Sequence, residues 1–328
     1  MAKAVNTAAA LVATHALVTG ANGYLGRAFC AHASAIGLPL RASVRTAATN
    51  PSATAGIAVG DIDGATDWSG ALEDCKTVMH LAARVHVMAE RASNPLVEFR
   101  LVNTEGTLNL ARQAAAAGVR RFIFVSSVKV NGEDTAAGHS FTVTDRPAPQ
   151  DPYGISKMEA EQGLHKIAAE TGMEVVIVRP PLVYGPGVKA NFASLMRAVQ
   201  RGIPLPLASV THNRRSFVAL DNLVDLLITC IDHPAAANQT FLASDGDDLS
   251  TADLLLRLGQ AMDKPARLFP VPPSLLQLGA SMLGKGDMAQ RLLGNLQVDI
   301  SHTRNTLNWT PPISVDEGLR RAAAGLKP

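Results

Sequence analysis

Short apolar runs alternate with helical stretches through the first 180 residues, and this alternation limits the possible folds more than any other feature of the chain. The runs that we expect to be strands are 15–19, 40–44, 56–59, 77–83, 121–127 and 174–180. Strands that are apolar along their whole length are buried on both faces, which is typical of a parallel sheet with helices on each side. The sequence therefore predicts an α/β fold built on a doubly wound parallel sheet.

The chain changes character after Arg179. The loop PPLVYGPG leads to a helical stretch at 190–202, then to a strand and a helix over 215–233 and a further strand at 239–244, and the rest is mostly helical. We expect this tail to form a smaller, mostly helical C-terminal cap over the sheet. The expected sheet domain comprises 12–180 and 213–245, and the expected cap comprises 181–212 and 246–328.

Charge, cysteine spacing and hydropathy argue against several classes of protein. The chain has 30 Lys and Arg against 28 Asp and Glu, and its net charge of +2 gives no reason to expect a nucleic acid or an acidic membrane as partner. The three cysteines are isolated, which argues against a zinc site or a disulfide framework and fits a reducing cytoplasm. The nine histidines lack metal-binding spacing, and no apolar run approaches the roughly 20 residues of a membrane span. We therefore expect a cytoplasmic protein with no bound metal and no membrane insertion. We expect the Ala-rich N-terminal segment to be an extension rather than a signal peptide.

The segment TGANGYLGRAF places three glycines, Gly20, Gly23 and Gly26, between the first expected strand and the first expected helix. Glycine there allows a tight turn, close backbone approach to a phosphate and close packing of helix on strand. The N-terminus of the helix offers unpaired N–H groups and a positive dipole end to a pyrophosphate. Three glycines alone can form an ordinary turn, but at the first strand-to-helix junction they favour dinucleotide binding.

The residues around the second and third expected strands bear on which dinucleotide is preferred. Sites for NAD usually carry Asp or Glu about 20 residues beyond the glycines, bound to the ribose 2′-hydroxyl. Here no Asp or Glu occurs from Met1 to Gly60, and the second strand carries Arg41 and Arg45 instead. Arg45, at the end of that strand, suits a 2′-phosphate. Asp61 either accepts from the adenine amino group or is a simple turn residue. NADP(H) is therefore favoured, and NAD(H) remains possible.

The stretch DPYGISK contains the residues of a proton-transfer site. Asp151 and Pro152 are typical of a helix start, so Tyr153 and Lys157 lie four residues apart on one face of the helix. A phenol normally has a pKa of about 10, and a neighbouring ammonium group favours its ionised form. The pair can therefore donate or accept a proton.

Ser126 and Ser127 end the expected strand 121–127, at the edge where an open α/β sheet binds its ligand. A serine hydroxyl there can hydrogen-bond a substrate carbonyl or alkoxide while Tyr153 moves the proton. Taken singly, these residues are also explained as a strand end and a helix face. Together, and downstream of a dinucleotide-binding loop, they predict hydride transfer with a proton relay.

Several motifs occur in the order found in the extended short-chain dehydrogenases/reductases, a family of nucleotide-sugar epimerases, dehydratases and reductases. They are TGANGYLG, GDI, HLAA (80–83), NTEGT (103–107), SS, YGISK, RPPLVYGPG, RRSFVALDNLV and DISHTRNTLNWTPP (299–312). The chain resembles this family over nearly its whole length, and TGxxGxxG followed by YxxxK is a specific pair. The resemblance implies a Rossmann fold for the sheet domain, a nucleotide-sugar-binding cap, and an NAD(P)-dependent oxidoreductase or epimerase.

The resemblance also implies roles for individual residues. Ser127, Tyr153 and Lys157 would be the catalytic triad, Asn103 a structural hydrogen-bonding residue and Ala82 a backbone contact to the cofactor. The residues expected at the cofactor are Gly20, Gly23, Tyr24, Leu25, Gly26, Arg45, Asp61, Ile62, Leu81, Ala82, Ala83, Asn103, Tyr153, Lys157 and Pro180. Those expected at the substrate are Arg84, Ser126, Ser127, Tyr153, Asn191, Arg215 and Arg291.

Arginines from the cap are the expected contacts to a substrate diphosphate. Arg215 and Arg291 resemble the family's pair of arginines for this group, and guanidinium forks suit a diphosphate. Arg214 can take the place of Arg215. The expected partner is therefore a nucleotide-diphosphate sugar, although neither the sugar nor the nucleotide follows from the sequence.

Two departures from the family's motifs bear on the reaction. Sugar dehydratases have an acidic pair directly after the catalytic hydroxyl residue, where this chain has Val128 and Lys129, so water elimination is not expected. Many epimerases have the motif FNxxG at the strand-to-cap junction, where this chain reads PPLVYG. These departures argue against a close copy of the best-known galactose epimerase.

Three functions remain open, and one leads. The leading expectation is an NADP(H)-dependent reductase of a UDP-linked 4-keto sugar, N-acetylated and 6-deoxy, in which hydride passes to C4 and Tyr153 donates the proton. The second is an NAD-dependent UDP-sugar 4-epimerase. The third is a non-catalytic nucleotide-sensing regulator, against which the intact Tyr153 and Lys157 count. The segments 94–118 and 152–171 are expected to be helices. Family members often pair these two helices with a second subunit, so a homodimer through 94–118 and 152–171 is expected.

Overall fold

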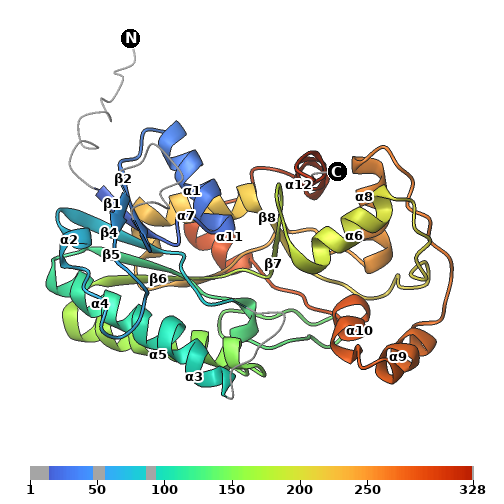
Figure 1. Ribbon diagram of the computed structural model, residues 1–328, viewed down its shortest axis with the longest axis horizontal. Coiled ribbons are helices and arrows are strands. Elements are labelled where there is room, and N and C mark those ends of the chain that lie inside the picture. Colours follow the sequence, from blue (N-terminus) through green and yellow to red (C-terminus); the bar gives the residue numbers. More distant parts are fainter. Residues whose placement is uncertain (1–14, 47–55, 86–93, 327–328) are drawn as a thin grey trace, which may run out of the picture. The chain divides into compact units, whose positions relative to one another are not determined.

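The computed structural model describes residues 15–46, 56–85 and 94–326, and Figure 1 shows its helices and strands. The chain divides into two compact units. The first unit comprises the residues up to Ser126, Asp151–Val178 and Leu227–Gln239, and the second comprises Ser127–Gln150, Arg179–Leu226 and Thr240–Pro328. The domain bounds expected from the sequence stay a prediction, because compactness alone does not show which segment binds which ligand.

The sheet of the first unit is parallel, as the uninterrupted apolar runs predict. Its strands are β1 (His15–Thr19), β2 (Leu40–Val44), β3 (Gly56–Ala58), β4 (Cys75–His80), β5 (Arg121–Val125) and β6 (Glu174–Arg179). The order in the sheet is β3-β2-β1-β4-β5-β6, followed by β9 (Thr240–Leu242). The chain builds outward from β1 to one side and from β4 to the other, which confirms the doubly wound α/β fold and places the topological switch between β1 and β4.

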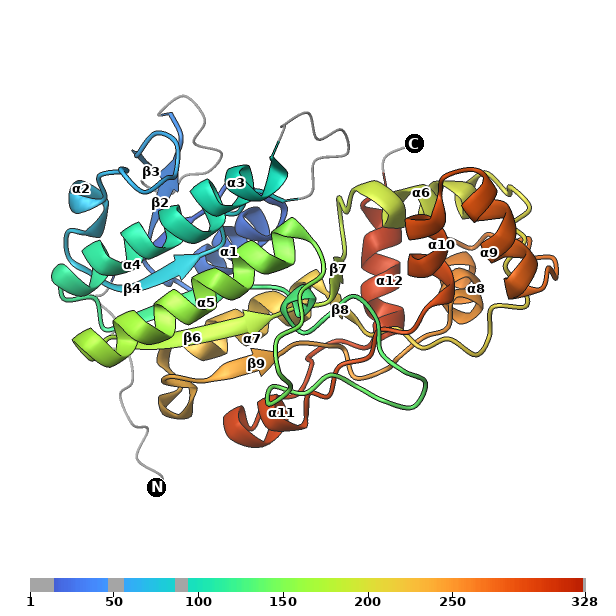
Figure 2. The same cartoon turned by 90° about the horizontal axis from the view of Figure 1, so that it is seen from below.

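Helices cover both faces of this sheet. α1 (Tyr24–Ala35) lies on one face, and α4 (Thr107–Ala116) and α5 (Pro152–Thr171) lie side by side on the other (Figures 1 and 2). The short α2 (Ser69–Leu72) follows β3. α5 begins as the sequence predicts, with the Asp151 carboxylate accepting from the Gly154 N–H at 2.6 Å and proline at the first position.

The expected helix 94–118 is not uniform. It consists of α3 (Pro95–Phe99), a π-helical segment η3 (Arg100–Gly106) and then α4. A π-helix widens each turn and occurs often at functional sites. The 3.6-residue pattern of apolar side chains does not reveal it, because the turns on each side keep ordinary α-helical spacing.

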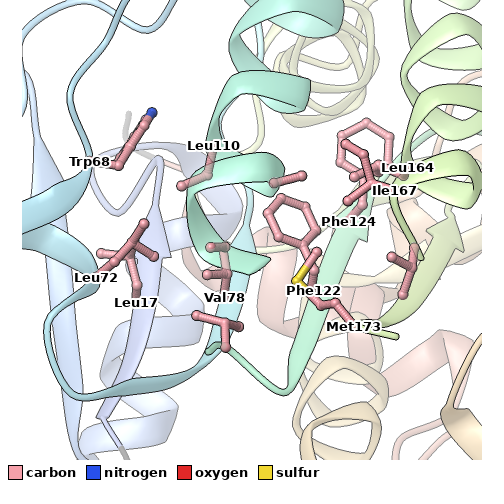
Figure 3. Packing of buried hydrophobic residues seen from close by; sticks show 14 of the residues in the cluster. Leu17, Trp68, Leu72, Val78, Leu110, Phe122, Phe124, Leu164, Ile167 and Met173 are labelled. Carbon is pink, nitrogen blue, oxygen red and sulfur yellow. The ribbon is translucent and has the colours of Figure 1, made fainter. Parts of the chain in front are cut away.

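The core of the first unit lies between the sheet and the α4–α5 face. Figure 3 shows Phe122 and Phe124 of β5 packed against Leu110 of α4 and Leu164 and Ile167 of α5. All but Ile167 are fully buried. Burying an apolar side chain of this size is worth roughly 1.5–3 kcal/mol relative to leaving it exposed, so this face anchors the end of β5 firmly.

One charged side chain is buried at the start of β5. Arg121 is 1% exposed, its Nε lies 2.7 Å from Glu174, and its Nη1 donates to the carbonyls of Cys230, Ile231 and His233 at 2.7–3.0 Å. These carbonyls lie at and just beyond the C-terminus of the helix α7 (Leu220–Asp232), where the last acceptors of a helix lack intrahelical partners. Arg121 therefore ties the segment 227–239 to the sheet.

The second unit contains a two-stranded parallel sheet, β7 (Leu182–Tyr184) with β8 (Phe217–Ala219), and is otherwise mostly helical. Its core includes Phe192 beside Tyr184, whose hydroxyl donates to Asp245 at 2.7 Å. The α-helices that belong wholly to it are α6 (Ala190–Gln200), α8 (Thr251–Ala261), α9 (Pro273–Met282), α10 (Gly286–Leu293), α11 (Ser301–Leu307) and α12 (Val315–Ala324). Within the part of the chain that the structure describes, no helix has both the length and the apolar character needed to cross a membrane.

Candidate active site

The loop between β1 and α1 is built around glycine. Gly20 has a φ of +68°, and a Cβ there would lie 2.7 Å from the backbone nitrogen of Ala82. A Cβ on Gly26 would overlap the Gly20 carbonyl oxygen, which the Gly23 N–H already contacts at 2.8 Å. Tyr24 begins α1, and the first turn of that helix contains no acidic residue. The loop therefore presents a helix N-terminus that is close-packed and free of negative charge, which suits a pyrophosphate.

The segment after β4 forms the other wall of this loop. Leu81 and Ala82 lie against Gly20, and the Ala82 N–H donates to the Thr19 hydroxyl at 3.1 Å. Ala83 follows, half-buried, while Leu25 is half-buried in the first turn of α1. The structure thus brings the predicted residues 20–26 and 81–83 together at the carboxyl ends of β1 and β4, beside the topological switch.

The second and third strands bring Arg45 and Asp61 together. The Arg45 Nε lies 2.7 Å from the Asp61 carboxylate, and both side chains are 76% exposed. Such an exposed pair contributes little stability. It does, however, place a carboxylate against the arginine that was expected to bind a 2′-phosphate. Arg41 faces elsewhere, because its Nη1 donates to the carbonyls of Ala71 and Glu73. The pairing weakens the sequence-based argument for a 2′-phosphate.

Asn103 connects the segment after β4 to the first turn of α5. Its Oδ1 accepts from the Arg84 N–H at 2.8 Å, and its Nδ2 donates to the Arg84 carbonyl and to the Ser156 hydroxyl, both at 3.0 Å. Ser156 in turn donates to the Tyr153 carbonyl at 2.7 Å. Asn103 is buried in the π-helical segment, and Ile62 packs against Gly106 of the same segment. The amide thus fixes the turn of α5 that carries Tyr153.

Tyr153 and Lys157 lie on one face of α5, as their spacing predicts. The Lys157 Nζ donates to the Val125 carbonyl at 2.8 Å, and it lies 4.3 Å from the centre of the Phe124 ring and 6.0 Å from that of Tyr153. The Tyr153 ring packs edge-on against Phe99. Lys157 is 1% exposed, and this burial lowers the pKa of its ammonium group from the ordinary 10.5 to about 7, although nearby Glu161 acts in the opposite direction.

The lowered pKa of Lys157 predicts a pH-dependent stability of the cofactor-free protein. Between pH 7 and 10 the unfolded chain binds a proton at Lys157 that the folded chain releases, so the free energy of unfolding should rise with pH by up to about 1.4 kcal/mol per unit. Lys157→Met should lack this rise in urea denaturation at pH 7, 8 and 9. Lys166→Met, on the same helix at a side chain 77% exposed, is the control and should follow the wild type. Parallel curves for Lys157→Met and the wild type would contradict the assignment.

Ser126 follows β5 directly, next to the Val125 carbonyl that Lys157 contacts. Its hydroxyl is buried and has no hydrogen-bond partner among the residues that the structure describes, although its N–H donates to Val178 at 2.8 Å. A buried hydroxyl without a partner costs free energy, so it suits a ligand group at this strand end. Lys157 and Ser126 therefore meet at the carboxyl edge of the sheet, as the sequence predicts.

Ser127 belongs to the second unit and caps a short 3₁₀ helix. Its hydroxyl accepts from the Lys129 N–H at 3.2 Å, and Lys129 pairs with Glu133. The carbonyl of Pro180, which is buried, accepts from the Val128 N–H at 3.0 Å. The grouping of Ser127 with Tyr153 and Lys157 as a catalytic triad, like the contact of Pro180 with the cofactor, stays a prediction.

His80 is a buried residue of this region whose contacts the sequence did not reveal. Its Nδ1 is 2.7 Å from the Thr19 hydroxyl, its Nε2 is 2.9 Å from the Thr107 hydroxyl, and its ring stacks on Phe124. Burial, with a smaller effect from the charge of Lys157, lowers the pKa of His80 to about 3. The ring is therefore neutral and holds the Thr19 hydroxyl that Ala82 contacts. His80 begins the motif HLAA, but the motif does not reveal these contacts, because the partners lie 61 and 27 residues away in the sequence.

The expected substrate residues of the cap line one cavity within the second unit. Asn191, Arg215 and Arg291 all border a space of about 630 Å³. Arg215 is half-buried and its Nη1 donates to the Gly294 carbonyl at 3.2 Å, whereas Arg214 is exposed and contacts the nearby carbonyls of its own loop. Burial, and next the charge of Arg291, lower the pKa of Arg215 to about 10. Two guanidinium groups close enough to oppose each other's charge suit an anionic ligand.

Across 15–46, 56–85 and 94–326 no cluster of three or more His, Cys, Asp or Glu side chains could hold an ion. All three cysteines are free and buried.

The chain is similar in sequence to known proteins. The family model described as "NAD dependent epimerase/dehydratase family" matches residues 16–243. A UDP-glucose 4-epimerase of Vibrio cholerae is 55% identical over 265 residues, which are 81% of each chain. A UDP-glucose 4-epimerase of Mycolicibacterium smegmatis is 28% identical over 78% of each chain.

Solved structures show the same fold. A UDP-glucose 4-epimerase of Thermotoga maritima with UDP-glucose superposes with a TM-score of 0.74 at 20% identity, covering 95% of this chain and 98% of the other. The UDP-glucose 4-epimerase of Thermus thermophilus in complex with NAD gives a TM-score of 0.74 at 21% identity, covering 95% and 99%. At these identities the likeness concerns the fold.

Proposed function

Since the chain belongs to the NAD-dependent epimerase/dehydratase family, within the extended short-chain dehydrogenases/reductases, we propose that it is a UDP-sugar 4-epimerase that works with bound NAD. The observation that carries this proposal is the 55% identity to the Vibrio cholerae UDP-glucose 4-epimerase over 81% of both chains. It favours the second function expected from the sequence over the keto-sugar reductase that was expected first. The Arg45–Asp61 pair supports the change from NADP(H) to NAD(H), because it neutralises the cation meant for a 2′-phosphate.

The residues of the first unit fit NAD at several points. The close-packed loop Gly20–Gly26 and the N-terminus of α1 would hold the pyrophosphate, and the backbone at Ala82 would contact the cofactor beside them. The Asp61 carboxylate would accept a hydrogen bond from the adenosine part of NAD, and the ion pair with Arg45 would keep that carboxylate in place. When bound, NAD would supply the hydride acceptor for oxidation of the sugar at C4 and the hydride donor for its reduction.

Tyr153 carries the proton transfer in this proposal. Its phenolate takes the proton of the sugar 4-hydroxyl when the sugar is oxidised, and the resulting phenol gives that proton back when the sugar is reduced, so atoms and charge balance over the cycle. Lys157 stabilises the ionised phenol through its positive charge, and Ser127 donates a hydrogen bond to the sugar oxygen. The diphosphate of the substrate would bind Arg215 and Arg291 in the second unit. We further propose that the protein is cytoplasmic and that it forms a homodimer through the helices 94–118 and 152–171.

Turnover without added cofactor tests the proposal. The purified protein should convert UDP-glucose into UDP-galactose, its 4-epimer, with no NAD or NADPH supplied, and nucleotide extracted after denaturation should be NAD. An epimerase needs no exchange of cofactor because it returns the hydride that it removes. A protein that turns over only with stoichiometric NADPH on a 4-keto sugar would instead be the reductase.

A further inference from the structure

The segment 61–68 leads from β3 to α2 and begins with the Asp61 carboxylate. β3 is three residues long and none of them is buried, so the strand itself gives this segment little support. The Asp61 side chain is 76% exposed, and the arginine that pairs with it, Arg45, is equally exposed. An exposed ion pair is weak, so Arg45 alone holds the carboxylate loosely. The position of the carboxylate therefore depends also on the backbone of the segment.

The Thr66 hydroxyl fixes the backbone at the start of this segment. It donates to the Asp61 carbonyl at 2.8 Å and accepts from the Asp63 N–H at 2.9 Å, and it lies 3.2 Å from the Asp63 carboxylate. Thr66 is 7% exposed, and hydrogen bonds in such a buried position are stronger than in water. The Asp63 carboxylate closes the turn by accepting from the Ala65 N–H at 2.8 Å. The backbone of Asp61 is thus held by a side chain five residues further along the chain.

Two amide side chains of α4 hold Thr66 in turn. The Gln113 Nε2 donates to the Thr66 carbonyl at 2.8 Å, and the Gln113 Oε1 accepts from the Trp68 N–H at 2.8 Å. The Asn109 Nδ2 donates to the same Thr66 carbonyl at 2.8 Å and to the Asp63 carbonyl at 3.3 Å. The two amides lie four residues apart on one face of the helix, and Gln113 donates to the Asn109 Oδ1 at 2.9 Å. Each amide therefore uses both its donor and its acceptor within one connected network.

The segment also packs directly on the helix that carries these amides. Ile62 lies against Gly106, where a Cβ would be 2.7 Å from the Ile62 side chain. Trp68, at the other end of the segment, is fully buried in the core that contains Leu110 of α4 (Figure 3). α4 follows directly on the π-helical segment that contains Asn103. One continuous helical stretch therefore supports both the segment 61–68 and the amide that fixes the first turn of α5.

We propose that Thr66 is a positioning residue for the adenosine end of the cofactor, and that Asn109 and Gln113 act through it. The network holds the backbone of Asp61 so that its carboxylate accepts a hydrogen bond from the amino group of adenine, while Arg45 pairs with Oδ1 of the same carboxylate. The inference rests on the proposed function in one respect, because that proposal names NAD as the cofactor. It adds that the preference for adenine depends on side chains that do not themselves contact the cofactor.

Competition between NAD and nicotinamide hypoxanthine dinucleotide tests the inference on the full-length protein as purified. The second dinucleotide has an oxygen in place of the adenine amino group, and an oxygen cannot donate to Asp61. The protein is equilibrated with an excess of both dinucleotides, and the bound nucleotides are then extracted and quantified. The wild type should prefer NAD by about tenfold or more, because the analogue loses a hydrogen bond to a charged group. Thr66→Val should lower this preference to nearly that of Asp61→Ala.

Gln113→Glu is a second variant that tests the same network without changing Thr66. It replaces the amide donor to the Thr66 carbonyl by an oxygen and keeps the acceptor for the Trp68 N–H. This variant should also lower the preference for NAD over the analogue. It keeps the inference testable if Thr66→Val does not yield folded protein.

Three further variants separate positioning from a general loosening of the fold. Thr66→Ser keeps the hydroxyl and should restore the wild-type preference. Thr171→Val is the matched control, because the Thr171 hydroxyl likewise donates to a backbone carbonyl, that of Ile167, and accepts from a backbone N–H, that of Met173. It should leave the preference unchanged. Adding Thr66→Val to Asp61→Ala should change the preference no further, because the carboxylate that Thr66 positions is already absent.

Two results would overturn the inference. A Thr66→Val variant that keeps the wild-type preference would show that the network supports the fold of the segment without positioning Asp61. An Asp61→Ala variant that keeps the preference would show that the carboxylate does not bind the adenine amino group. Failure of the protein to epimerise UDP-sugars would reject the proposed function, and it is measured in a separate assay that leaves this ratio of bound nucleotides unchanged.

Discussion

Tyr153→Phe should lower kcat by about 10²–10⁴-fold while the fold and NAD binding are retained, because general acid–base catalysis is typically worth that much. The substitution removes one hydroxyl and keeps the ring that packs edge-on against Phe99. The backbone of residue 153 keeps its hydrogen bond from Ser156, so α5 should begin as in the wild type. The measurement is kcat for UDP-glucose epimerisation, together with the NAD content of the purified variant.

Tyr184→Phe is the matched control for this prediction. Tyr184 is buried in the second unit, where its hydroxyl donates to Asp245, and that carboxylate also accepts from the Ala219 N–H and from Asn222. The hydroxyl also lies 3.3 Å from the Val315 carbonyl oxygen. Its loss should cost about 1.5–3 kcal/mol of stability, the usual worth of a hydrogen bond to a charged group, and leave kcat unchanged. A Tyr153→Phe variant with kcat near that of the wild type would reject the proton relay.

Arg121→Met should lower the free energy of unfolding by about 1.5–3 kcal/mol, the usual worth of a hydrogen bond that involves a charged group. The guanidinium is 1% exposed, and it binds Glu174, which is 29% exposed, and three carbonyls at and just beyond the end of α7. Methionine fills part of the space but donates no hydrogen bonds, and the remaining donors, Arg120 to Ile231 and Ala236 to His233, replace only part of what is lost. Urea denaturation measures the loss.

Arg120→Met supplies the comparison at the neighbouring position. Arg120 also pairs with Glu174 and Asp232, but its side chain is 44% exposed. An exposed pair is worth about 0–1 kcal/mol, so this variant should be nearly as stable as the wild type. Equal destabilisation of the two variants would mean that burial does not set the cost at Arg121.

The strands of the first unit could be predicted closely from the sequence. The expected runs 15–19 and 40–44 coincide with β1 and β2, because each is largely apolar and lies beside a turn that contains glycine. α5 was equally predictable, since Asp151 and Pro152 begin it and Gly172, with a φ of +77°, ends it. These features depend on neighbouring residues, which a sequence displays directly.

Contacts between distant residues were not predictable. Arg45 looked free because no acidic residue precedes Gly60, whereas Asp61, which pairs with it, lies beyond the next strand. Arg41 looked like a second candidate for a phosphate, but its guanidinium binds carbonyls near α2. The pairing of β2 with β3 sets the first contact, and the position of α2 sets the second. Neither has a signature in local spacing.

The π-helical segment Arg100–Gly106 rotates the side chains at one end of a long helix, about the helix axis, relative to those at the other end. Before it, Phe99 packs against Tyr153, and after it, Leu110 packs in the core between α4 and the sheet. Each residue advances an α-helix by about 100°, so deleting one residue here would turn the first end relative to the second by about that angle. Asn103 would then face away from Arg84 and Ser156, although every side chain of the site would still be present in the sequence. The length of this segment therefore sets how the two ends of the helix are rotated relative to each other. A deletion there would change that rotation, whereas a substitution would not.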